Sequence, residues 1–192
     1  MTRQLILASA SPRRHDLLTA AGIPHTVLSA DTDESLPSGI APHEAVEILS
    51  ARKAEAILPI APAGSIILAA DTVVTLDGGI LGKPRDELDA KRMLLSLSGR
   101  EHHVFTGVTV TDGMKTVTRH AKTAVRMRII SEEEIDAYIK TGEPMDKAGA
   151  YGIQGRAAFF VSGIEGDYAN VVGLPVSLVG EILRIDFAFP LF

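Results

Sequence analysis

Apolar and polar residues follow one another along the first half of the chain in blocks that predict strands and helices in turn. The apolar runs within residues 4–8 and 66–70 have the length of buried strands, and residues 25–29 are predicted to form a second short strand. The segment after Pro12 and residues 42–58 instead space their apolar residues at intervals of three and four, which is typical of helices. Because strands alternate with helices, the pattern favours an α/β fold.

The second half of the chain is predicted to add a long hairpin and further helices. The dipeptide Asp112-Gly113 separates two strand-like runs and is a strong hairpin signal. A hairpin makes the sheet mixed rather than wholly parallel. The remaining predicted elements are an extension of the third strand over 72–76, helices at 86–97, 131–140 and 175–185, a glycine-rich loop at 148–155 and a strand at 157–164.

Composition narrows the class of protein. The 192 residues are 46% hydrophobic and 22% charged, as in an ordinary globular protein, and we expect one domain over 1–192. A net charge of −5 argues against binding long nucleic acid, and the absence of cysteine excludes disulfides and thiolate metal sites. The longest uncharged stretch, 56–70, is shorter than the roughly 20 residues of a membrane span. We therefore expect a cytoplasmic protein with no membrane partner.

The segment from Ser9 to Arg14 carries the strongest local signal for a binding site. It follows a predicted strand, with Ser11 suited to the N-cap of a helix and Pro12 to its first position. Arg13 and Arg14 then fall in the first turn, where the helix dipole disfavours positive charge. A bound anion, held by backbone N–H groups and the two guanidinium groups, would remove that conflict. A solvated arginine pair is the equally weighted alternative.

Lys53 interrupts the apolar stripe of the predicted 42–58 helix, because it shares that face with Val46, Leu49 and Ile57. A lysine in that position points inward, toward a cleft, or past the helix edge into solvent. From the residues alone, extension of the side chain into solvent is the better interpretation.

Asp71 follows five apolar residues and is predicted to stand at the end of a buried strand. Ligands of open α/β sheets gather at such strand ends, where a carboxylate can bind Mg²⁺ or deprotonate water. The alternative is an aspartate that caps the following turn. Glu34, in a polar loop, becomes a second metal ligand only if Asp71 lies close. Lys83 adds a cation in the loop after the strand pair, where an ordinary surface turn is the alternative.

Three further features do not indicate a site. Gly149, Gly152 and Gly155 lack the strand–helix context of a dinucleotide fingerprint. The adjacent His102 and His103 point to opposite faces of a strand and cannot share a metal. The three C-terminal phenylalanines are predicted to form core or a subunit contact, and they are Phe187, Phe189 and Phe192.

Taken together, these segments resemble the Maf family of nucleotide pyrophosphatases over nearly the whole chain. The most specific matches are Ser9-Ala10-Ser11-Pro12-Arg13-Arg14 and the run from Asp146 to Gly155, Asp-Lys-Ala-Gly-Ala-Tyr-Gly-Ile-Gln-Gly. The other matching segments, in the order expected, are Asp33-Glu34, Arg52-Lys53-Ala54, Ala69-Ala70-Asp71-Thr72, Gly82-Lys83-Pro84, Leu97-Ser98-Gly99, Gly142-Glu143-Pro144 and Val172-Gly173-Leu174-Pro175.

The resemblance implies an inosine triphosphate pyrophosphatase-like fold, a mixed central sheet flanked by helices with two lobes around a cleft. It also implies a homodimer that cleaves a nucleoside triphosphate at the α–β link with a divalent metal, Mg²⁺ before Mn²⁺ or Co²⁺. The family's general base falls on Asp71, and its substrate-selecting positions fall on Arg13, Thr72 and Gln154. Its phosphate-binding positions fall on Ser9, Arg13, Arg14, Lys53 and Lys83, and its metal-binding positions fall on Glu34 and Asp71.

The sequence around Gln154 is similar to the dTTP/UTP branch of that family. A glutamine amide offers a donor and an acceptor side by side, which matches the carbonyl and N–H of uracil or thymine. The resemblance also implies a link to septum formation or division arrest, and activity on modified nucleotides such as 5-methyl-CTP or pseudo-UTP. The alternatives are a 7-methyl-GTP pyrophosphatase and a nucleotide-binding regulator of septation without significant hydrolysis.

Overall fold

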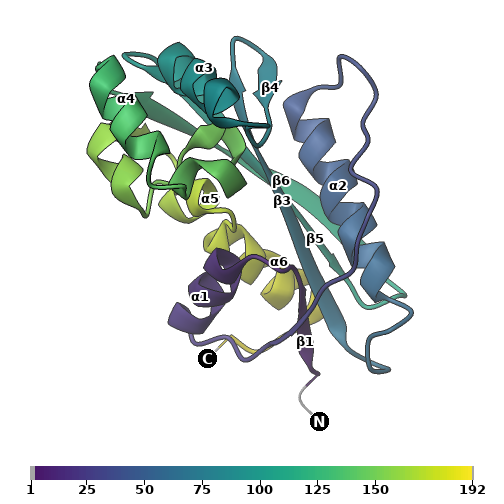
Figure 1. Cartoon of the computed structure of the whole chain (residues 1–192). Coiled ribbons are helices and arrows are strands. Elements are labelled where there is room, and N and C mark those ends of the chain that lie inside the picture. The colour runs from purple at the N-terminus through teal and green to yellow at the C-terminus, as the bar shows by residue number, and fades with distance from the viewer. Residues whose placement is uncertain (1–2, 192) are drawn as a thin grey trace. The chain divides into compact units, whose positions relative to one another are not determined.

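The computed structural model describes residues 3–191, which form a mixed α/β fold (Figure 1). The strands are β1 (Leu5–Ala8), β2 (Thr26–Leu28), β3 (Ile66–Leu76), β4 (Gly79–Leu81), β5 (Glu101–Thr111), β6 (Thr116–Met127) and β7 (Val161–Glu165). The α-helices are α1 (Pro12–Ala20), α2 (Pro42–Ile57), α3 (Glu87–Leu97), α4 (Glu132–Ile139), α5 (Tyr168–Val172) and α6 (Val176–Phe187). Three short 3₁₀ segments are η1 (Glu143–Asp146), η2 (Ala148–Ala150) and η3 (Arg156–Phe160).

The strands form one sheet in the order β2-β1-β3-β5-β6-β7, and β4 pairs with β3 outside this path. β1 runs parallel to both β2 and β3, whereas the β3–β4 and β6–β7 pairs are antiparallel. The predicted mixed sheet is therefore confirmed. The parallel part comes from strand–helix alternation in the first half of the chain. In the antiparallel part, β3 and β4 form a hairpin, whereas β6 and β7 pair across the segment that contains α4.

The chain divides into two compact units. The first unit comprises residues 1–71, 106–121 and 173–192, and the second comprises 72–105 and 122–172. The sequence predicted one domain without a linker, and although the family resemblance implied two lobes, no residue pattern marked where they divide. Three of the boundaries fall inside the continuous strands β3, β5 and β6 rather than in loops, so no turn or linker residues mark them in the sequence.

In the first unit, alternate residues of β1 pack against different helices. Leu5 and Leu7 belong to a buried cluster that includes residues of α1 and α6, whereas Ile6 and Ala8 pack with residues of α2. This two-residue period lets four consecutive apolar residues be buried on both faces of the sheet. Phe187 and Phe189 are buried in the first cluster, so their predicted core role is confirmed, and Phe192 lies outside the described residues.

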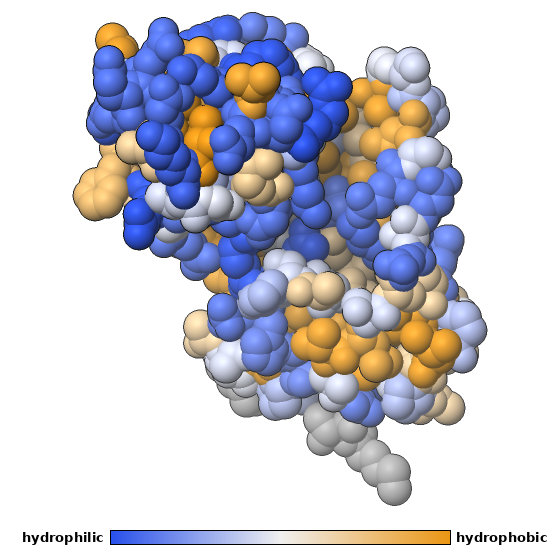
Figure 2. Space-filling model, viewed as in Figure 1, coloured by the Kyte–Doolittle hydropathy of each residue, from blue (hydrophilic) through white to orange (hydrophobic). Residues whose placement is uncertain are grey.

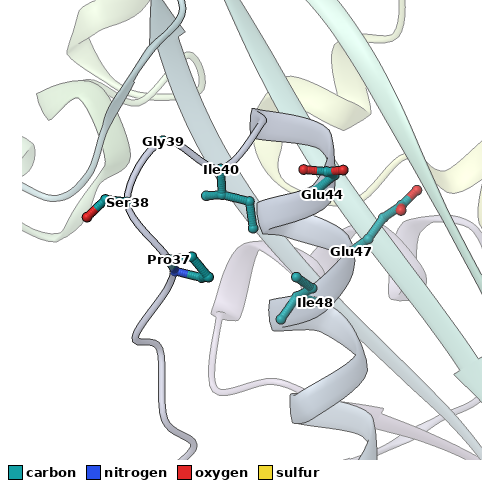
Figure 3. A pocket seen from close by; sticks show the side chains of 7 residues that line it. All are labelled: Pro37, Ser38, Gly39, Ile40, Glu44, Glu47 and Ile48. Carbon is teal, nitrogen blue, oxygen red and sulfur yellow. The ribbon is translucent and has the colours of Figure 1, made fainter.

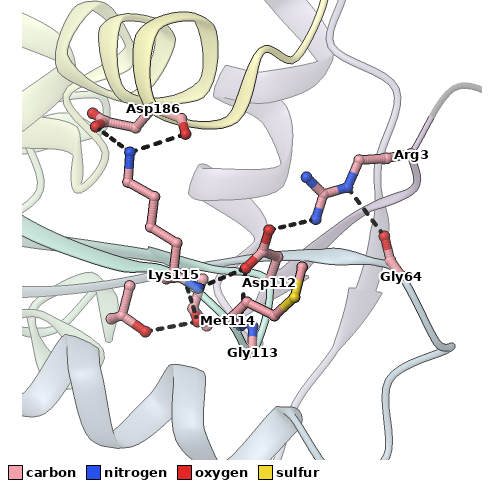
Figure 4. Close-up of polar contacts among 9 residues, drawn as sticks. Arg3, Gly64, Asp112, Gly113, Met114, Lys115 and Asp186 are labelled. Atoms are coloured by element: carbon pink, nitrogen blue, oxygen red, sulfur yellow. Dashed lines mark hydrogen bonds and ion pairs between the residues drawn. The ribbon is translucent and has the colours of Figure 1, made fainter.

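The β5–β6 hairpin is fastened to neighbouring segments of the first unit by its turn (Figure 4). Asp112 accepts hydrogen bonds from the backbone N–H groups of Met114 and Lys115 at 3.0 and 2.8 Å, and from the Arg3 guanidinium at 2.7 Å. The Lys115 ammonium donates to the backbone carbonyl and side-chain carboxylate of Asp186 at 3.0 and 2.7 Å. The predicted Asp-Gly turn therefore also ties the N-terminal segment and α6 to the sheet.

The helices of the second unit begin as their sequences predict. Asp86 precedes α3 and accepts a hydrogen bond from the backbone N–H of Asp89 at 2.7 Å. Ser131 and Glu134 form a reciprocal capping box at the start of α4, at 3.3 and 3.0 Å. Each contact satisfies a backbone donor that the first helical turn leaves without an internal acceptor.

The prediction of a strand over residues 157–164 is partly wrong. Residues 156–160 form η3, and only Val161–Glu165 form β7. Ala157 and Phe160 are buried while Phe159 is 80% exposed, a spacing of three that suits a helical turn better than a strand. The short α5 was not predicted.

Figure 2 shows one face of the molecule, where hydrophilic side chains predominate and hydrophobic ones form separate patches. Within residues 3–191, no helix combines the length and apolar composition needed to cross a membrane.

Candidate functional site

The loop from β1 into α1 brings Ser9 and Arg14 together. Ser9 is buried directly after β1, and its Oγ accepts hydrogen bonds from the Ser11 backbone N–H at 3.2 Å and from Arg14 Nη1 at 3.1 Å. Arg14 Nε also donates to the backbone carbonyl of Gly173 at 2.7 Å. The guanidinium is therefore held by two acceptors from different segments, which fixes its direction.

The start of α1 matches the predicted anion-binding geometry in most respects. Ser11 occupies the N-cap position and Pro12 is the first helical residue, so Arg13 and Arg14 lie in the first turn, which contains no acidic residue. The Ser11 side chain makes no capping hydrogen bond, contrary to what its position predicted. The turn before α1 is held instead by a hydrogen bond from the Ser11 backbone N–H to the Ser9 hydroxyl.

Arg14 is electrostatically linked to the acidic residues of the same unit. Burial lowers the pKa of Arg14, the negative charge of Asp71 raises it, the neighbouring Arg13 lowers it and Glu34 raises it. Arginine remains protonated through shifts of this kind. The first turn of α1 and the carboxylates of Asp71 and Glu34 thus belong to one charged cluster.

Lys53 joins the two carboxylates of that cluster. Its ammonium lies 2.5 Å from Asp71 Oδ1 and 2.8 Å from Glu34 Oε1. The Lys53 side chain is only 19% exposed, so it does not extend past the helix edge into solvent, and that interpretation is wrong. The side chain points instead toward Asp71 and Glu34, because two carboxylates within reach stabilise the ammonium more than an apolar helix face would.

Asp71 does not stand at a strand end, and that prediction is corrected by the structure. It is the sixth residue of the eleven-residue strand β3, which continues to Leu76. β3 continues because residues beyond Asp71 pair with β4, through Val74, Thr75 and Leu76. Asp71 is 8% exposed, so its carboxylate is nearly enclosed and depends on Lys53 for a partner.

The chemistry of Asp71 and Glu34 fits a hard divalent cation completed by other ligands. Within residues 3–191, no group of three or more His, Cys, Asp or Glu side chains is arranged to hold a metal ion. Mg²⁺ in nucleotide enzymes is usually held by one or two carboxylates together with substrate phosphates. Asp71 and Glu34, which share the Lys53 ammonium, meet that requirement. A site in which protein side chains supplied every ligand would leave no position for a phosphate oxygen.

The remaining predicted site residues belong to the second unit. Thr72 is half-buried in β3, and Lys83 and Gln154 are exposed on loops. The loops of Lys83 and Gln154 are connected, because the Gly149 backbone N–H donates to the Gly82 carbonyl at 3.0 Å.

Glu143 fixes the loop that carries Gln154. Its carboxylate accepts hydrogen bonds from the Tyr138 hydroxyl at 3.0 Å and from the Arg156 backbone N–H at 3.1 Å. A Cβ atom on Gly155 would stand 2.1 Å from Glu143 Oε1, so a side chain there would displace the Glu143 carboxylate. These contacts close the segment between η1 and η3 into a loop with a defined shape.

Three residues that contact one or another of the predicted site segments were present in the matched motifs but received no role from the sequence. Gly173 contributes only its carbonyl, Arg52 donates to the loop of Glu34, and Glu143 closes the Gln154 loop. The carbonyl group of Gly173 could not be predicted as an acceptor, because every residue type has a backbone carbonyl. Arg52 could have been noticed as a second cation directly beside Lys53.

A separate surface hollow of about 500 Å³ lies between the loop before α2 and the first turns of that helix (Figure 3). Its lining comprises Pro37, Ser38, Gly39, Ile40, Glu44, Glu47 and Ile48. It contains none of the predicted site residues. Two carboxylates without a lining cation make it unsuitable for a polyphosphate.

Comparison with known proteins gives consistent matches over nearly the full length. The family model described as Maf-like protein matches residues 4–185. The dTTP/UTP pyrophosphatase of Symbiobacterium thermophilum is 50% identical over 190 residues, covering 99% of this chain and 97% of the relative. The protein of the same name from Pelotomaculum thermopropionicum is 46% identical, covering 95% and 96%, and that from Moorella thermoacetica is 50% identical, covering 95% and 94%.

Solved structures give weaker matches. The Staphylococcus aureus Ham1 protein has a TM-score of 0.47 and 13% identity, covering 65% of this chain and 72% of its own. A dITP/XTP pyrophosphatase from Mycobacterium abscessus has a TM-score of 0.45 and 12% identity, covering 96% of both chains.

Proposed function

We propose that this chain, which belongs to the Maf-like protein family, hydrolyses pyrimidine nucleoside triphosphates to the monophosphate and pyrophosphate. The names of its relatives support dTTP and UTP as the substrates. The observation that carries the proposal is the charged cluster of the first unit, in which Lys53 joins the carboxylates of Asp71 and Glu34 and Arg14 interacts with both. Cations grouped beside a shielded carboxylate are what hydrolysis of a polyphosphate requires.

In the proposed reaction, Asp71 accepts a proton from a water molecule as that water attacks phosphorus at the α–β bridge. A new P–O bond forms, the bridging P–O bond breaks, and the electron pair leaves with pyrophosphate. Asp71 suits this role because its carboxylate is nearly enclosed and is held in place by the Lys53 ammonium.

The cationic residues are proposed to offset the charge that develops on the phosphates. Arg14 is pre-oriented by Ser9 and Gly173, so it needs no rearrangement to face an anion. Arg13 stands in the same helical turn, where backbone N–H groups add partial positive charge. Lys53 and, in the second unit, Lys83 complete the proposed phosphate-binding set.

Glu34 and Asp71 are the proposed ligands of a divalent cation, Mg²⁺ before Mn²⁺ or Co²⁺. When bound, such an ion withdraws charge from the phosphate oxygens and helps the leaving group depart. Asp71 serves as base, as metal ligand or as both, and the two roles use the same carboxylate.

Base selection is assigned to Arg13, Thr72 and Gln154. This assignment rests on the family resemblance and on the chemistry of the amide of Gln154, which can donate and accept at once. Action in the cytoplasm, assembly as a homodimer, activity on modified pyrimidine nucleotides and an effect on septation remain predictions.

A panel of purified nucleotides tests the proposal. Protein and Mg²⁺ are incubated with each canonical triphosphate and with 7-methyl-GTP, and the products are separated by chromatography. We expect dTTP and UTP to give monophosphate and pyrophosphate in equal amounts. Orthophosphate with nucleoside diphosphate would place cleavage at the β–γ link instead, and faster turnover of 7-methyl-GTP would overturn the pyrimidine assignment. Binding without any product would favour a regulator.

A further inference from the structure

The loop before α2 holds Glu34 through contacts with a residue that has no role in the proposed reaction. Residues 31–41 form no regular secondary structure, and the Glu34 side chain is 62% exposed. Its carboxylate nevertheless lies 2.8 Å from the Lys53 ammonium. For the carboxylate to keep that position, the backbone of the irregular loop must itself be held, because conformational freedom opposes any fixed contact.

Arg52 supplies that restraint from α2. Its Nη1 donates to the backbone carbonyl of Asp33 at 3.0 Å and to that of Ser35 at 2.7 Å. The two acceptors are the residues on either side of Glu34. One guanidinium nitrogen of Arg52 therefore hydrogen-bonds the backbone immediately before and immediately after Glu34. Arg52 precedes Lys53 on the same helix, so a single helical turn carries both the clamp and the ammonium that Glu34 contacts.

The loop is also shaped locally. The Asp33 carboxylate accepts hydrogen bonds from the Ser35 backbone N–H at 2.8 Å and from the Ser35 hydroxyl at 2.7 Å. Asp33 is thereby used inside the turn, which leaves Glu34 as the carboxylate that faces Lys53.

We propose that Arg52 is a positioning residue for metal binding, because it clamps the carbonyl groups on both sides of Glu34 and so presents that carboxylate beside Asp71. Arg52 touches neither substrate nor metal in this role. The inference rests on the proposed function, since it takes Glu34 as a metal ligand. Arg52 would thus have a function although it takes no part in the reaction itself.

The test compares Arg52→Met, Arg52→Lys and Glu34→Gln with the unaltered protein. Arg184→Met is the matched control, because it removes an exposed arginine from a helix of the same unit. Mn²⁺ is titrated into each protein without nucleotide, and free Mn²⁺ is followed by electron paramagnetic resonance. Circular dichroism confirms that each variant is folded at the temperature used. Pyrophosphate release from dTTP is measured on the same preparations at several metal concentrations.

We expect Arg52→Met to weaken Mn²⁺ binding about 10-fold, the scale on which residues that orient metal ligands act. The metal concentration for half-maximal rate should rise in parallel, with a smaller change in KM for dTTP at saturating metal. Arg52→Lys should recover part of the affinity, because it keeps a donor and the charge, and Arg184→Met should match the unaltered protein. If Arg52→Met is unfolded, Arg52→Gln, which keeps an amide donor, should give an intermediate loss.

Unchanged Mn²⁺ affinity in a folded Arg52→Met protein, with a clear loss in Glu34→Gln, would overturn the role of Arg52 and leave that of Glu34 standing. Unchanged affinity in Glu34→Gln would overturn both. Absence of pyrophosphate release from the unaltered protein, with Mn²⁺ binding still dependent on Arg52, would reject the proposed reaction but uphold the clamp.

Discussion

Arg14 Nε lies 2.7 Å from the carbonyl oxygen of Gly173, a residue 159 positions further along the chain. Because Arg14 Nη1 also contacts Ser9 Oγ at 3.1 Å, the guanidinium is fixed by two acceptors that lie in different directions. Charge alone does not explain an arginine at this position. The planar guanidinium group explains it, because its several N–H donors can make both contacts and still face an anion.

Arg14→Lys should therefore be far from conservative. An ammonium on a flexible stem cannot reach Ser9 and Gly173 together with the planar geometry of a guanidinium. We expect kcat/KM for dTTP to fall roughly 10- to 100-fold, as for the loss of one hydrogen bond to a charged group. Steady-state kinetics measure this, with Arg184→Lys as the control. Equal kcat/KM in Arg14→Lys and the unaltered protein would show that charge alone suffices.

Asp71→Asn should abolish most of the turnover without preventing binding. The amide retains the shape of the carboxylate but cannot accept a proton from water, so kcat should fall by at least ~10². Binding of a non-hydrolysable dUTP analogue, measured by calorimetry, should persist. Asp77→Asn is the control, because Asp77 is an exposed aspartate paired with Arg100. A turnover within a few-fold of normal would remove Asp71 from the reaction.

Gln154→Leu should reduce discrimination between uracil and cytosine nucleotides. Leucine has a similar size but offers neither donor nor acceptor, so UTP would lose its matched pair and CTP would lose less. The ratio of kcat/KM for UTP to that for CTP should narrow by roughly 5- to 100-fold, corresponding to about 1–3 kcal/mol. Thr72→Val should shift the same ratio in the same direction. An unchanged ratio in both variants would locate base selection elsewhere.

Asp112 makes a pH-dependent contribution to the stability of the first unit. The Lys115 backbone N–H and then the Arg3 guanidinium lower the pKa of Asp112 from 3.8 to about 2. A carboxyl whose pKa is lowered by folding stabilises the protein above its unfolded value, and this stabilisation is lost as pH falls from 3.8 toward 2.

Asp112→Asn should consequently lower the free energy of unfolding by roughly 1–3 kcal/mol at neutral pH, since hydrogen bonds to a charged acceptor are lost. The difference in free energy of unfolding between Asp112→Asn and the unaltered protein should shrink as pH approaches 2. Urea unfolding at a series of pH values measures it. A difference that stayed constant across the acid range would show that the charge of Asp112 is not what stabilises the turn.

Gly107 is required by close packing of β5 against α2. A Cβ atom at this position would lie 2.2 Å from the backbone carbonyl oxygen of Val46, which cannot move without shifting the helix. We expect Gly107→Ala to cost about 1–3 kcal/mol or more in stability. Gly180→Ala is the matched control, because its Cβ would meet only the Leu191 side chain at 3.4 Å and alanine favours a helix. Thermal unfolding of both variants measures the difference.

The sequence predicted the elements of the first unit well because their patterns are local. Apolar runs marked β1 and β3, and proline with the preceding serine marked the start of α1. The predicted extension over 72–76 is part of β3, but Asp71 was still predicted to stand at a strand end, because a polar residue after five apolar ones resembles one. Whether a strand continues is decided by its pairing partner, here β4, and that information is not local.

The candidate site was predicted less completely than the fold. Residue type and motif identified Ser9, Arg14, Lys53 and Asp71, and the structure brings them together in the first unit. Neither the carbonyl of Gly173 nor the clamp of Arg52 could be read from residue type. One is a backbone group from a distant segment, and the other depends on how an irregular loop is folded.

The ammonium of Lys53 acts as an internal counter-ion in the protein without ligands. Two carboxylates brought this close would repel each other, and Lys53 removes that repulsion before any metal arrives. A divalent cation that entered alone would have to displace this resident charge, whereas a polyphosphate bound by Lys53 would draw the ammonium away from the carboxylates. We therefore expect Mn²⁺ to bind to the protein alone, but more weakly than it binds together with a nucleotide.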